Sequence, residues 1–225
     1  MTATDHVEIW PIGLQVSAPA LGSLRAKLDD RERARCARLL DPTARARYAV
    51  AHGAARLILA GRLNAKPEQI RWRTGPHGKP ELTDLARAPH VSLSHSDDLA
   101  LLAVADREVG VDVERIAVRW AAVPPVRLFL PEETAAVAAA DHAARARLFT
   151  QLFTRKEACV KAAGGTMLPH GIRLRTLGES PLLVSDSHGA EWRVRDLGSF
   201  PGYGAAVALR GPGDFTVGLR RWSAQ

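Results

Sequence analysis

The sequence that decides the fold is HVSLSHSDDLALLAVADREVGVDVER, residues 90–115. It contains three runs rich in Val and Leu, and short stretches containing Asp separate them. Such runs favour strands, whereas Asp and Ser favour the turns between them. We therefore predict strands at residues 90–94, 99–105 and 109–114.

The third run, Gly110-Val-Asp-Val-Glu114, ends on two acids. Residues two apart in a strand point to the same face, so Asp112 and Glu114 project together while Val111 and Val113 face a core. Two carboxylates on one face repel each other unless a cation lies between them, and oxygen ligands suit Mg²⁺. The alternative is an exposed strand face that carries ordinary acids.

Outward from this stretch, the N-terminal part reads as one strand followed by helices. The second helix begins at Asp41-Pro42, because Asp is a good N-cap and Pro suits the first helical position. A loop, Gly75-Pro-His-Gly-Lys-Pro80, follows. The elements expected here are a strand at 7–16, helices at 21–40 and 41–63, and a short strand at 70–74.

The C-terminal part again places helices before strands. A helix opens at Pro131, and a longer helix over residues 142–163 ends at Gly164-Gly165. An antiparallel meander is expected after it, with strands at 172–176, 182–185, 191–197, 203–209 and 215–220. Since each half holds a helical block and a sheet, we predict an α+β fold of two α/β lobes, residues 1–108 and 109–225, rather than a doubly wound sheet.

Composition limits the possible functions. The chain has 225 residues, 46% apolar and 24% charged, which is typical of a soluble globular protein. No run approaches the ~20 apolar residues that span a bilayer, and residues 1–6 do not resemble a secretory signal. Cys36 and Cys159 fit no disulfide or zinc spacing, so we expect a cytoplasmic protein.

The charge is strongly basic. Lys and Arg number 31 against 24 Asp and Glu, a net charge of +7, so an anionic partner is expected. The densest basic cluster is Arg31, Arg33, Arg35, Arg38, Arg45 and Arg47. It is either a solvated helix face or an anion site. Few aromatic residues accompany it, so a stacking platform for single-stranded nucleic acid is not supported.

The later helix carries a second polar pair in Phe153-Thr-Arg-Lys-Glu-Ala-Cys-Val-Lys161. Glu157 and Lys161 lie one turn apart, which is also the spacing of an ordinary surface ion pair. However, Phe149 and Val160 belong to the buried stripe of this helix, and the pair lies at its border. It therefore faces an interface rather than open solvent.

Two further motifs, one in a loop and one at the end of a predicted strand, complete the set. In His77-Gly-Lys-Pro80, glycine permits close approach of a ligand, proline stiffens the loop and lysine supplies charge for phosphate. In Ser92-Leu-Ser-His-Ser96, hydroxyl and imidazole groups can donate to phosphate. Taken alone, the first motif is better interpreted as a charged turn and the second as a structural histidine.

The ordered occurrence of these four motifs resembles the 4′-phosphopantetheinyl transferase superfamily, in the larger form that activates carrier proteins of peptide and polyketide synthetases. The resemblance covers residues 31–168. It implies two pseudo-symmetric lobes with coenzyme A between them. It also implies transfer of the phosphopantetheine arm to a serine of apo acyl or peptidyl carrier proteins, with release of adenosine 3′,5′-bisphosphate.

The resemblance also implies roles for individual residues. Asp112, Glu114 and Glu157 match the Mg²⁺ ligands; Glu157 also matches the proposed general base, and Lys161 a catalytic phosphate contact. The coenzyme A contacts it implies are Arg35, Arg47, His77, Gly78, Lys79, Pro80, Ser94, His95, Asp112, Lys156 and Lys161, with Arg31 as the alternative to Arg35. Phe153 stands where the family often has Trp, and the basic residues of the cluster are arginines where lysines are usual.

The partners expected are therefore Mg²⁺, coenzyme A and an acidic apo carrier protein, with no nucleic acid and no membrane, and a monomer. A basic nucleic-acid-binding domain would explain the charge but leave the paired carboxylates without a purpose. A Mg²⁺-dependent nucleotide phosphohydrolase is the second alternative, and it would release phosphate without a carrier protein.

Overall fold

The structure is a computed structural model, and it describes residues 4–75, 79–83, 88–117, 128–165, 174–186 and 188–224. In chain order, its elements are β1 (Asp5–Gly13), α1 (Ala18–Ala26), α2 (Asp30–Arg38), α3 (Pro42–Arg62), η1 (Pro67–Gln69), β2 (Trp72–Thr74), β3 (Pro80–Leu82), β4 (His90–Ser96), β5 (Leu99–Ala105), β6 (Val109–Arg115), α4 (Pro131–Ala139), α5 (His142–Ala162), β7 (Leu182–Ser185), β8 (Glu191–Asp196), β9 (Tyr203–Arg210) and β10 (Phe215–Leu219). The predicted α+β class is confirmed.

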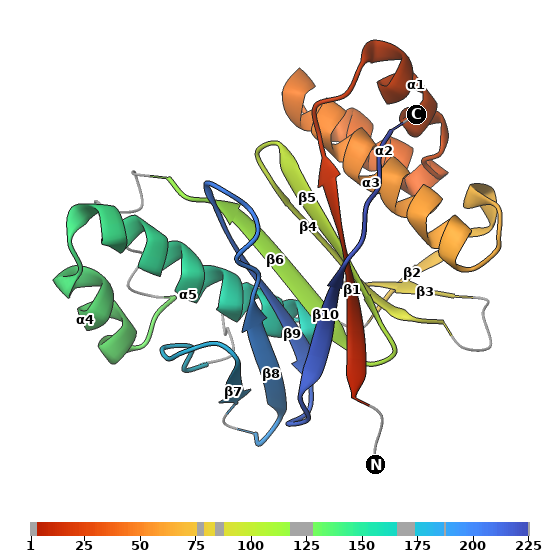
Figure 1. Cartoon of the computed structure of the whole chain (residues 1–225). Coiled ribbons are helices and arrows are strands. Elements are labelled where there is room, and N and C mark those ends of the chain that lie inside the picture. The colour runs from red at the N-terminus through yellow and green to blue at the C-terminus, as the bar shows by residue number, and fades with distance from the viewer. Residues whose placement is uncertain are drawn as a thin grey trace.

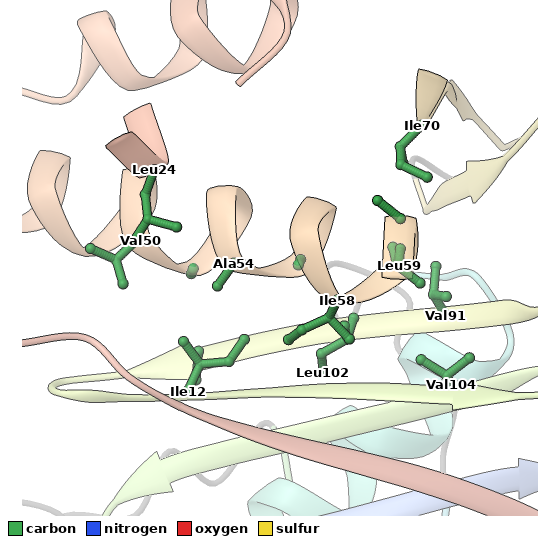
Figure 2. Packing of buried hydrophobic residues seen from close by; sticks show 14 of the residues in the cluster. Ile12, Leu24, Val50, Ala54, Ile58, Leu59, Ile70, Val91, Leu102 and Val104 are labelled. Carbon is green, nitrogen blue, oxygen red and sulfur yellow. The ribbon is translucent and has the colours of Figure 1, made fainter. Parts of the chain in front are cut away.

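The first sheet has the strand order β10-β1-β5-β4, and α3 covers one of its faces (Figure 1). Asp41 caps α3 as predicted, accepting hydrogen bonds from the backbone N–H groups of Thr43 and Ala44. Figure 2 shows Val50, Ala54 and Ile58 of α3 above side chains of the sheet. Burial of this helix stripe against the alternate residues of β5 fixes the register of the layer.

The second sheet has the order β6-β9-β8-β7, all antiparallel, and α5 packs on it. The side chains along its strands alternate between two hydrophobic cores. On β9, Ala206 and Ala208 contact the α5 layer, whereas Val207 and Leu209 join a core that also contains Val7 and other residues of the first sheet. The order of layers is therefore α3, first sheet, second sheet, α5.

One predicted helix is wrong. The helix expected over residues 21–40 is two helices, α1 and α2, with a break at residues 27–29. Asp29 and Glu32 form a capping box in which each side chain accepts the other residue's backbone N–H, so the chain starts a new helix there.

The C-terminal meander is only partly right. Strands β7, β8 and β9 follow each other antiparallel as predicted, but β10 pairs parallel with β1 in the other sheet. Phe215 at its start is fully buried in the core between the sheets, which makes this placement favourable. Of the strand expected at 172–176, residues 174–176 are not in a strand, and 172–173 lie outside the described residues.

Candidate functional site

The site is built on the polar face of β6. Val109, Val111 and Val113 are fully buried in the core between the two sheets. Because side chains alternate along a strand, Asp112 and Glu114 point to the other side, toward α5. Asp112 is itself buried, with 2% of its surface exposed. The predicted strand and the common face of the two carboxylates are confirmed.

Gly110 determines how closely α5 approaches this face. A Cβ at this position would collide with the backbone of Ala158 and Ala162. The helix therefore lies directly against β6 at the turn that carries Glu157 and Lys161. No role for this glycine was predicted from the sequence.

Asp112 is the centre of the site. Its Oδ1 accepts a hydrogen bond from the hydroxyl of Ser94 at 2.8 Å and contacts Nζ of Lys161 at 2.6 Å. Lys161 Nζ also donates to Ser94 Oγ at 2.9 Å. The second oxygen, Oδ2, is buried and has no hydrogen-bond partner in the described part of the chain. Burying a carboxylate oxygen without a hydrogen-bond donor costs free energy, so this atom is a candidate ligand for a cation.

Glu157 completes the acidic group. Burial raises the pKa of its carboxyl, and the negative charges of Asp112 and Glu114 raise it further against the opposing effect of Lys161. A carboxyl with a raised pKa releases its proton less readily and, once ionised, is a stronger base. The three predicted acids therefore act on one another electrostatically.

The acidic group is not a preformed metal site. Within the described residues, no three acidic, histidine or cysteine side chains already lie close enough together to hold a metal ion. The unpartnered Oδ2 of Asp112 and the raised pKa of Glu157 nevertheless indicate that Lys161 does not fully balance the negative charge of this group. An oxygen-only donor set of this kind fits Mg²⁺.

A row of serines on β4 orients these acids, and only Ser94 among them was predicted to be a site residue. Ser92 Oγ accepts the backbone N–H of Val111 at 3.1 Å. Ser94 donates to Asp112, and Ser96 donates to Glu114 Oε2 at 2.7 Å. The period-2 spacing in SLSHS was the available signal, since it places all three hydroxyls on the side of β4 that faces β6.

His95 marks a basic region beside the acidic group. Burial lowers the pKa of its imidazole, and the neighbouring cations His52, Lys161, Arg47 and Arg35 lower it further. These charges come from α3, α5 and α2. The structure therefore brings the predicted residues Arg35, Arg47 and His95 to one electropositive place, which is suited to an anion.

The two predicted arginines differ in their contacts. Arg47 is held by Asp97 and Asp98 in the turn between β4 and β5, with 2.7 Å between its Nη2 and Asp98 Oδ1. Arg35 lies on the exposed side of α2 and makes no hydrogen bond or ion pair with a described residue. Arg35 is therefore the more available of the two for a ligand.

The loop motif is only partly described. His77 and Gly78 lie outside the described residues, and Pro80 opens β3. Lys79 donates from Nζ to the carbonyls of Val109 at 2.9 Å and Ala162 at 3.3 Å. It thus lies at the C-terminal end of α5, away from Asp112, and its assignment as a coenzyme A contact remains a prediction.

Lys156 lies apart from the acidic group. It is 2% exposed, and its Nζ contacts Glu133 Oε2 of α4 at 2.8 Å and the carbonyl of Leu174. This lysine connects α5 to α4 rather than to β6. Its predicted contact with coenzyme A is untested.

The chain is similar to a family of known transferases. The family model described as "4′-phosphopantetheinyl transferase superfamily" matches residues 108–208, which include β6, α5 and their carboxylates. No described helix is long and apolar enough to cross a bilayer.

Three individual proteins are also similar to it. The 4′-phosphopantetheinyl transferase HetI of Nostoc sp. is 31% identical over 93% of this chain and 90% of its own length. The 4′-phosphopantetheinyl transferase Sfp of Bacillus subtilis is 27% identical over 70% of each chain. The 4′-phosphopantetheinyl transferase AcpT of Escherichia coli K12 is 38% identical over 50% of this chain and 57% of its own length.

Proposed function

Since the chain belongs to the 4′-phosphopantetheinyl transferase superfamily and is a transferase, we propose that it moves the phosphopantetheine arm of coenzyme A onto a serine of apo acyl or peptidyl carrier proteins. The serine oxygen forms a bond to the phosphorus next to the pantetheine, the pyrophosphate bond breaks, and adenosine 3′,5′-bisphosphate leaves. The observation that carries this proposal is the buried, half-satisfied Asp112 beside Glu157 and Lys161.

The roles of the residues follow from their environment. Glu157, whose pKa is raised by burial and by Asp112, accepts the proton of the attacking serine. Lys161 keeps 29% of its side chain exposed and donates to a phosphate oxygen as charge develops on it. Ser94 holds Asp112 by its Oδ1, which leaves Oδ2 directed to a ligand.

A divalent cation fits the same group. Asp112, Glu114 and Glu157 would hold Mg²⁺, which neutralises the pyrophosphate when it is bound. Pyrophosphate and carboxylates repel each other without such a charge. Phosphoryl transfer depends mostly on positioning and electrostatic stabilisation, which these side chains supply.

The basic region around His95 is proposed to receive the adenosine end of coenzyme A. Arg35 and Arg47 supply positive charge there, and the imidazole of His95 can donate a hydrogen bond. Lys161 acts on His95 and also contacts Asp112. We further propose that residues 1–108 and 109–225 are two related lobes with the site at their junction. The serine contacts between β4 and β6 support a junction at this place.

The remaining proposals concern the setting of the reaction. We place it in the cytoplasm, where the two buried thiols, Cys36 and Cys159, remain reduced. One chain supplies all the named groups, so a monomer suffices. The excess of basic residues favours an acidic carrier protein as the partner.

Mass spectrometry of several apo carrier proteins, each incubated with the enzyme, coenzyme A and Mg²⁺, tests the function. Each transfer adds the phosphopantetheine arm, an increment of about 340 Da, to one serine. Glu157→Gln is the control, because it removes the base with little change in volume. If no carrier gains this mass, or if phosphate is released without a carrier protein, the proposal is wrong and a phosphohydrolase becomes the better interpretation.

A further inference from the structure

The last turn of α5 carries Lys161, and the carbonyl groups of this turn have no further helical N–H to bond. Three of the last four carbonyls are bonded instead by the turn that follows the helix. Their hydrogen bonds are Ala163 N to Cys159 O at 2.9 Å, Gly165 N to Val160 O at 2.9 Å and Gly164 N to Lys161 O at 3.2 Å. The fourth carbonyl, that of Ala162, is bonded from outside the helix.

Lys79 supplies that bond. Its Nζ donates to Ala162 O at 3.3 Å and to Val109 O, at the start of β6, at 2.9 Å. The carbonyl of Glu108 accepts the N–H of Arg210 on β9, so the next carbonyl, that of Val109, points to the open edge of the second sheet. One ammonium group therefore satisfies an unpaired carbonyl of a helix and an unpaired carbonyl of a strand.

The backbone and the stem of Lys79 are both held in place. Its carbonyl accepts the N–H of Gly75 at 2.8 Å and so closes the hairpin of β2 and β3. Its aliphatic stem lies against Gly164, since a Cβ added to that glycine would come within 3.8 Å of the Lys79 Cβ and 3.9 Å of its Cδ. Gly164 has a φ of +78°, the left-handed conformation common after a helix. The side chain thus extends from the hairpin to the end of α5.

The charge of Lys79 is directed at the helix rather than at an acid. It forms no ion pair with a carboxylate in the described part of the chain. The acids whose charges act on it are Glu81 and Glu108. Each of them already has an arginine partner, Arg73 and Arg210 respectively. The C-terminal end of a helix carries a partial negative charge, so the helix dipole stabilises an ammonium group placed there.

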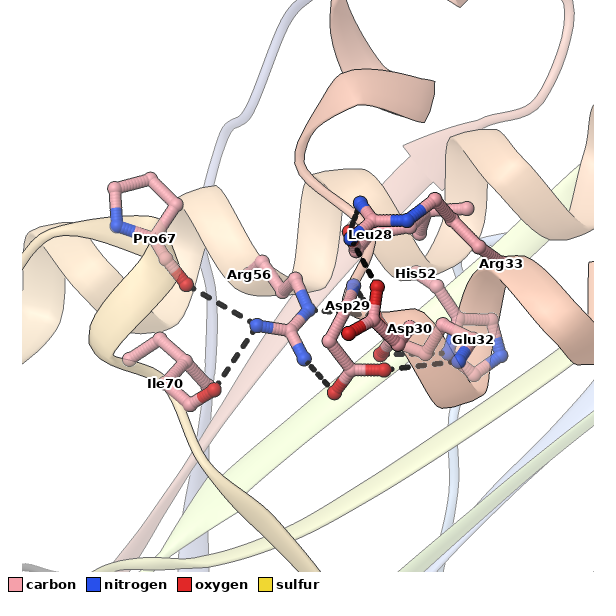
Figure 3. A network of polar contacts seen from close by, with 9 residues as sticks. All are labelled: Leu28, Asp29, Asp30, Glu32, Arg33, His52, Arg56, Pro67 and Ile70. Carbon is pink, nitrogen blue, oxygen red and sulfur yellow. Dashed lines mark hydrogen bonds and ion pairs between the residues drawn. The ribbon is translucent and has the colours of Figure 1, made fainter.

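The long helix of the other half is anchored differently. Figure 3 shows Arg56 of α3 bonded to the carbonyls of Pro67 and Ile70, in the segment that follows α3, at 3.1 and 2.9 Å. Both ends of that anchor belong to residues 1–108, so it fixes α3 within its own half. Lys79 instead reaches from residues 1–108 to β6 and α5, the two elements that carry the acidic group.

We propose that Lys79 is a positioning residue for the transfer reaction: its ammonium group clamps the last turn of α5 to β6 and so holds Lys161 beside Asp112. The inference rests on the proposed function, because it gives the loop at residues 75–80 a part in that reaction. Lys161 directly precedes Ala162, and its Nζ lies 2.6 Å from Asp112 Oδ1. Without the clamp the last turn frays, and a misplacement of about 1 Å in a reacting group can lower the rate about a hundredfold.

Single-turnover transfer to an apo carrier protein that the wild type modifies distinguishes this role from a direct contact with coenzyme A. Lys79→Met keeps the aliphatic stem and removes the ammonium group. At saturating coenzyme A it should lower the rate about tenfold or more, while the KM and the calorimetric Kd for coenzyme A change less than about twofold. Lys79→Arg, which can donate to both carbonyls, should recover part of the rate. A direct contact predicts the reverse, a weaker Kd with the rate retained.

Amide hydrogen exchange measures the clamp itself, without turnover. In Lys79→Met the amides of residues 163–165 should exchange about tenfold faster or more, because their hydrogen bonds close the last turn of α5. The amides of residues 149–153, in the middle of the helix, should keep the wild-type rate. Lys66→Met is the matched control, since Lys66 is an exposed lysine in the same half and should change neither exchange nor transfer. Unchanged exchange at residues 163–165 in Lys79→Met would refute the clamp.

A double-mutant cycle links the clamp to the position of α5. Gly110→Ala pushes the helix away from β6, because a Cβ there collides with the backbone of Ala158 and Ala162. If Lys79 acts through the same helix, Lys79→Met should lower the rate of Gly110→Ala less than it lowers the rate of the wild type. Losses that multiply independently would mean that Lys79 does not act through the position of α5.

The outcomes distinguish this inference from the proposed function. If wild type modifies no apo carrier protein, both proposals fail. If wild type modifies one and Lys79→Met keeps the wild-type rate, or loses only affinity for coenzyme A, the role of Lys79 is wrong while the transferase function stands. Thermal unfolding identifies a misfolded Lys79→Met, in which case Lys79→Gln, which removes the charge and shortens the side chain, replaces it in the same comparisons.

Discussion

Two lysines on the same helix each bind a carboxylate, and their surroundings differ. Lys156 contacts Glu133 at 2.8 Å, and both side chains are almost completely buried, at 2% and 0% exposed. Glu133 also accepts hydrogen bonds from Leu130 N, Thr176 N and Thr176 Oγ1. Both of its oxygens are satisfied, so this pair joins α4 to α5 and has no capacity for a ligand.

Lys161, five residues later, contacts Asp112 at 2.6 Å in a pair that is open on one side. The lysine is 29% exposed, and Asp112 Oδ2 has no partner within the described residues. An ion pair whose carboxylate oxygens all have hydrogen-bond partners contributes to packing. A pair with an unpartnered carboxylate oxygen can still bind a ligand. The difference separates a structural ion pair from a functional one on adjacent turns of one helix.

The largest expected effect is on the open pair. Asp112→Asn should reduce transfer about a thousandfold or more, because it removes a charge from the group that balances the pyrophosphate. The free energy of unfolding should change by less than about 1 kcal/mol, since Lys161 can turn to solvent. Single-turnover transfer and urea unfolding measure the two quantities. If Asp112→Asn unfolds easily but still transfers, the Lys161–Asp112 pair is structural rather than functional.

The closed pair should show the opposite behaviour. Lys156→Met leaves the Glu133 carboxylate buried without its cation, which costs about 3–5 kcal/mol of unfolding free energy. The rate of transfer per folded molecule should stay near that of wild type. Adding Glu133→Gln to this variant removes the second charge and should recover much of the stability, and a double-mutant cycle measures the coupling. A strong loss of transfer with stability intact would instead support a contact between Lys156 and coenzyme A.

The distance between α5 and β6 supports a third test. Gly110→Ala places a methyl group against the backbone of Ala158 and Ala162 and forces the helix away from β6. Overpacking of this kind costs about 1–3 kcal/mol, and transfer should fall because Glu157 and Lys161 move from Asp112. Gly13→Ala is the matched control, because a Cβ there meets nothing within 4 Å. Equal loss of transfer in both variants would argue against a role for close approach.

The smallest expected effect is the pH dependence that Glu32 contributes. Its folded pKa lies below the ordinary value of 4.5, so its stabilising effect is present above that pH and is lost as the pH falls through the folded pKa. The difference in unfolding free energy between wild type and Glu32→Gln should be larger at pH 7 than at a pH below 4.5. A difference that does not depend on pH would mean that the charge of Glu32 contributes little.

Much of this site is predictable from the sequence. The period-2 pattern of GVDVE places Asp112 and Glu114 on one face, and helical spacing places Glu157 and Lys161 one turn apart. Both patterns are local, so they survive in the folded chain. Ser92 and Ser96 were within reach of the same reasoning, because SLSHS has the spacing that aims all three hydroxyls to one side.

Other features depended on contacts between distant segments. The break between α1 and α2 is stabilised by Arg56, more than twenty residues after the capping box. The pairing of β10 with β1 joins the two ends of the chain, and no local pattern predicts it. His52 gave no signal in the sequence, since its orientation comes from Glu32 and Tyr48 together.

Which side chains share a face therefore follows from local sequence patterns: the two acids on β6, and the acid and lysine on α5. What each face contacts follows from the folded chain, because burial and partners arise from the packing of segments far apart in the sequence. The fold enclosed Lys156 with Glu133, left Lys161 open beside Asp112, and brought His52 to the basic region around His95.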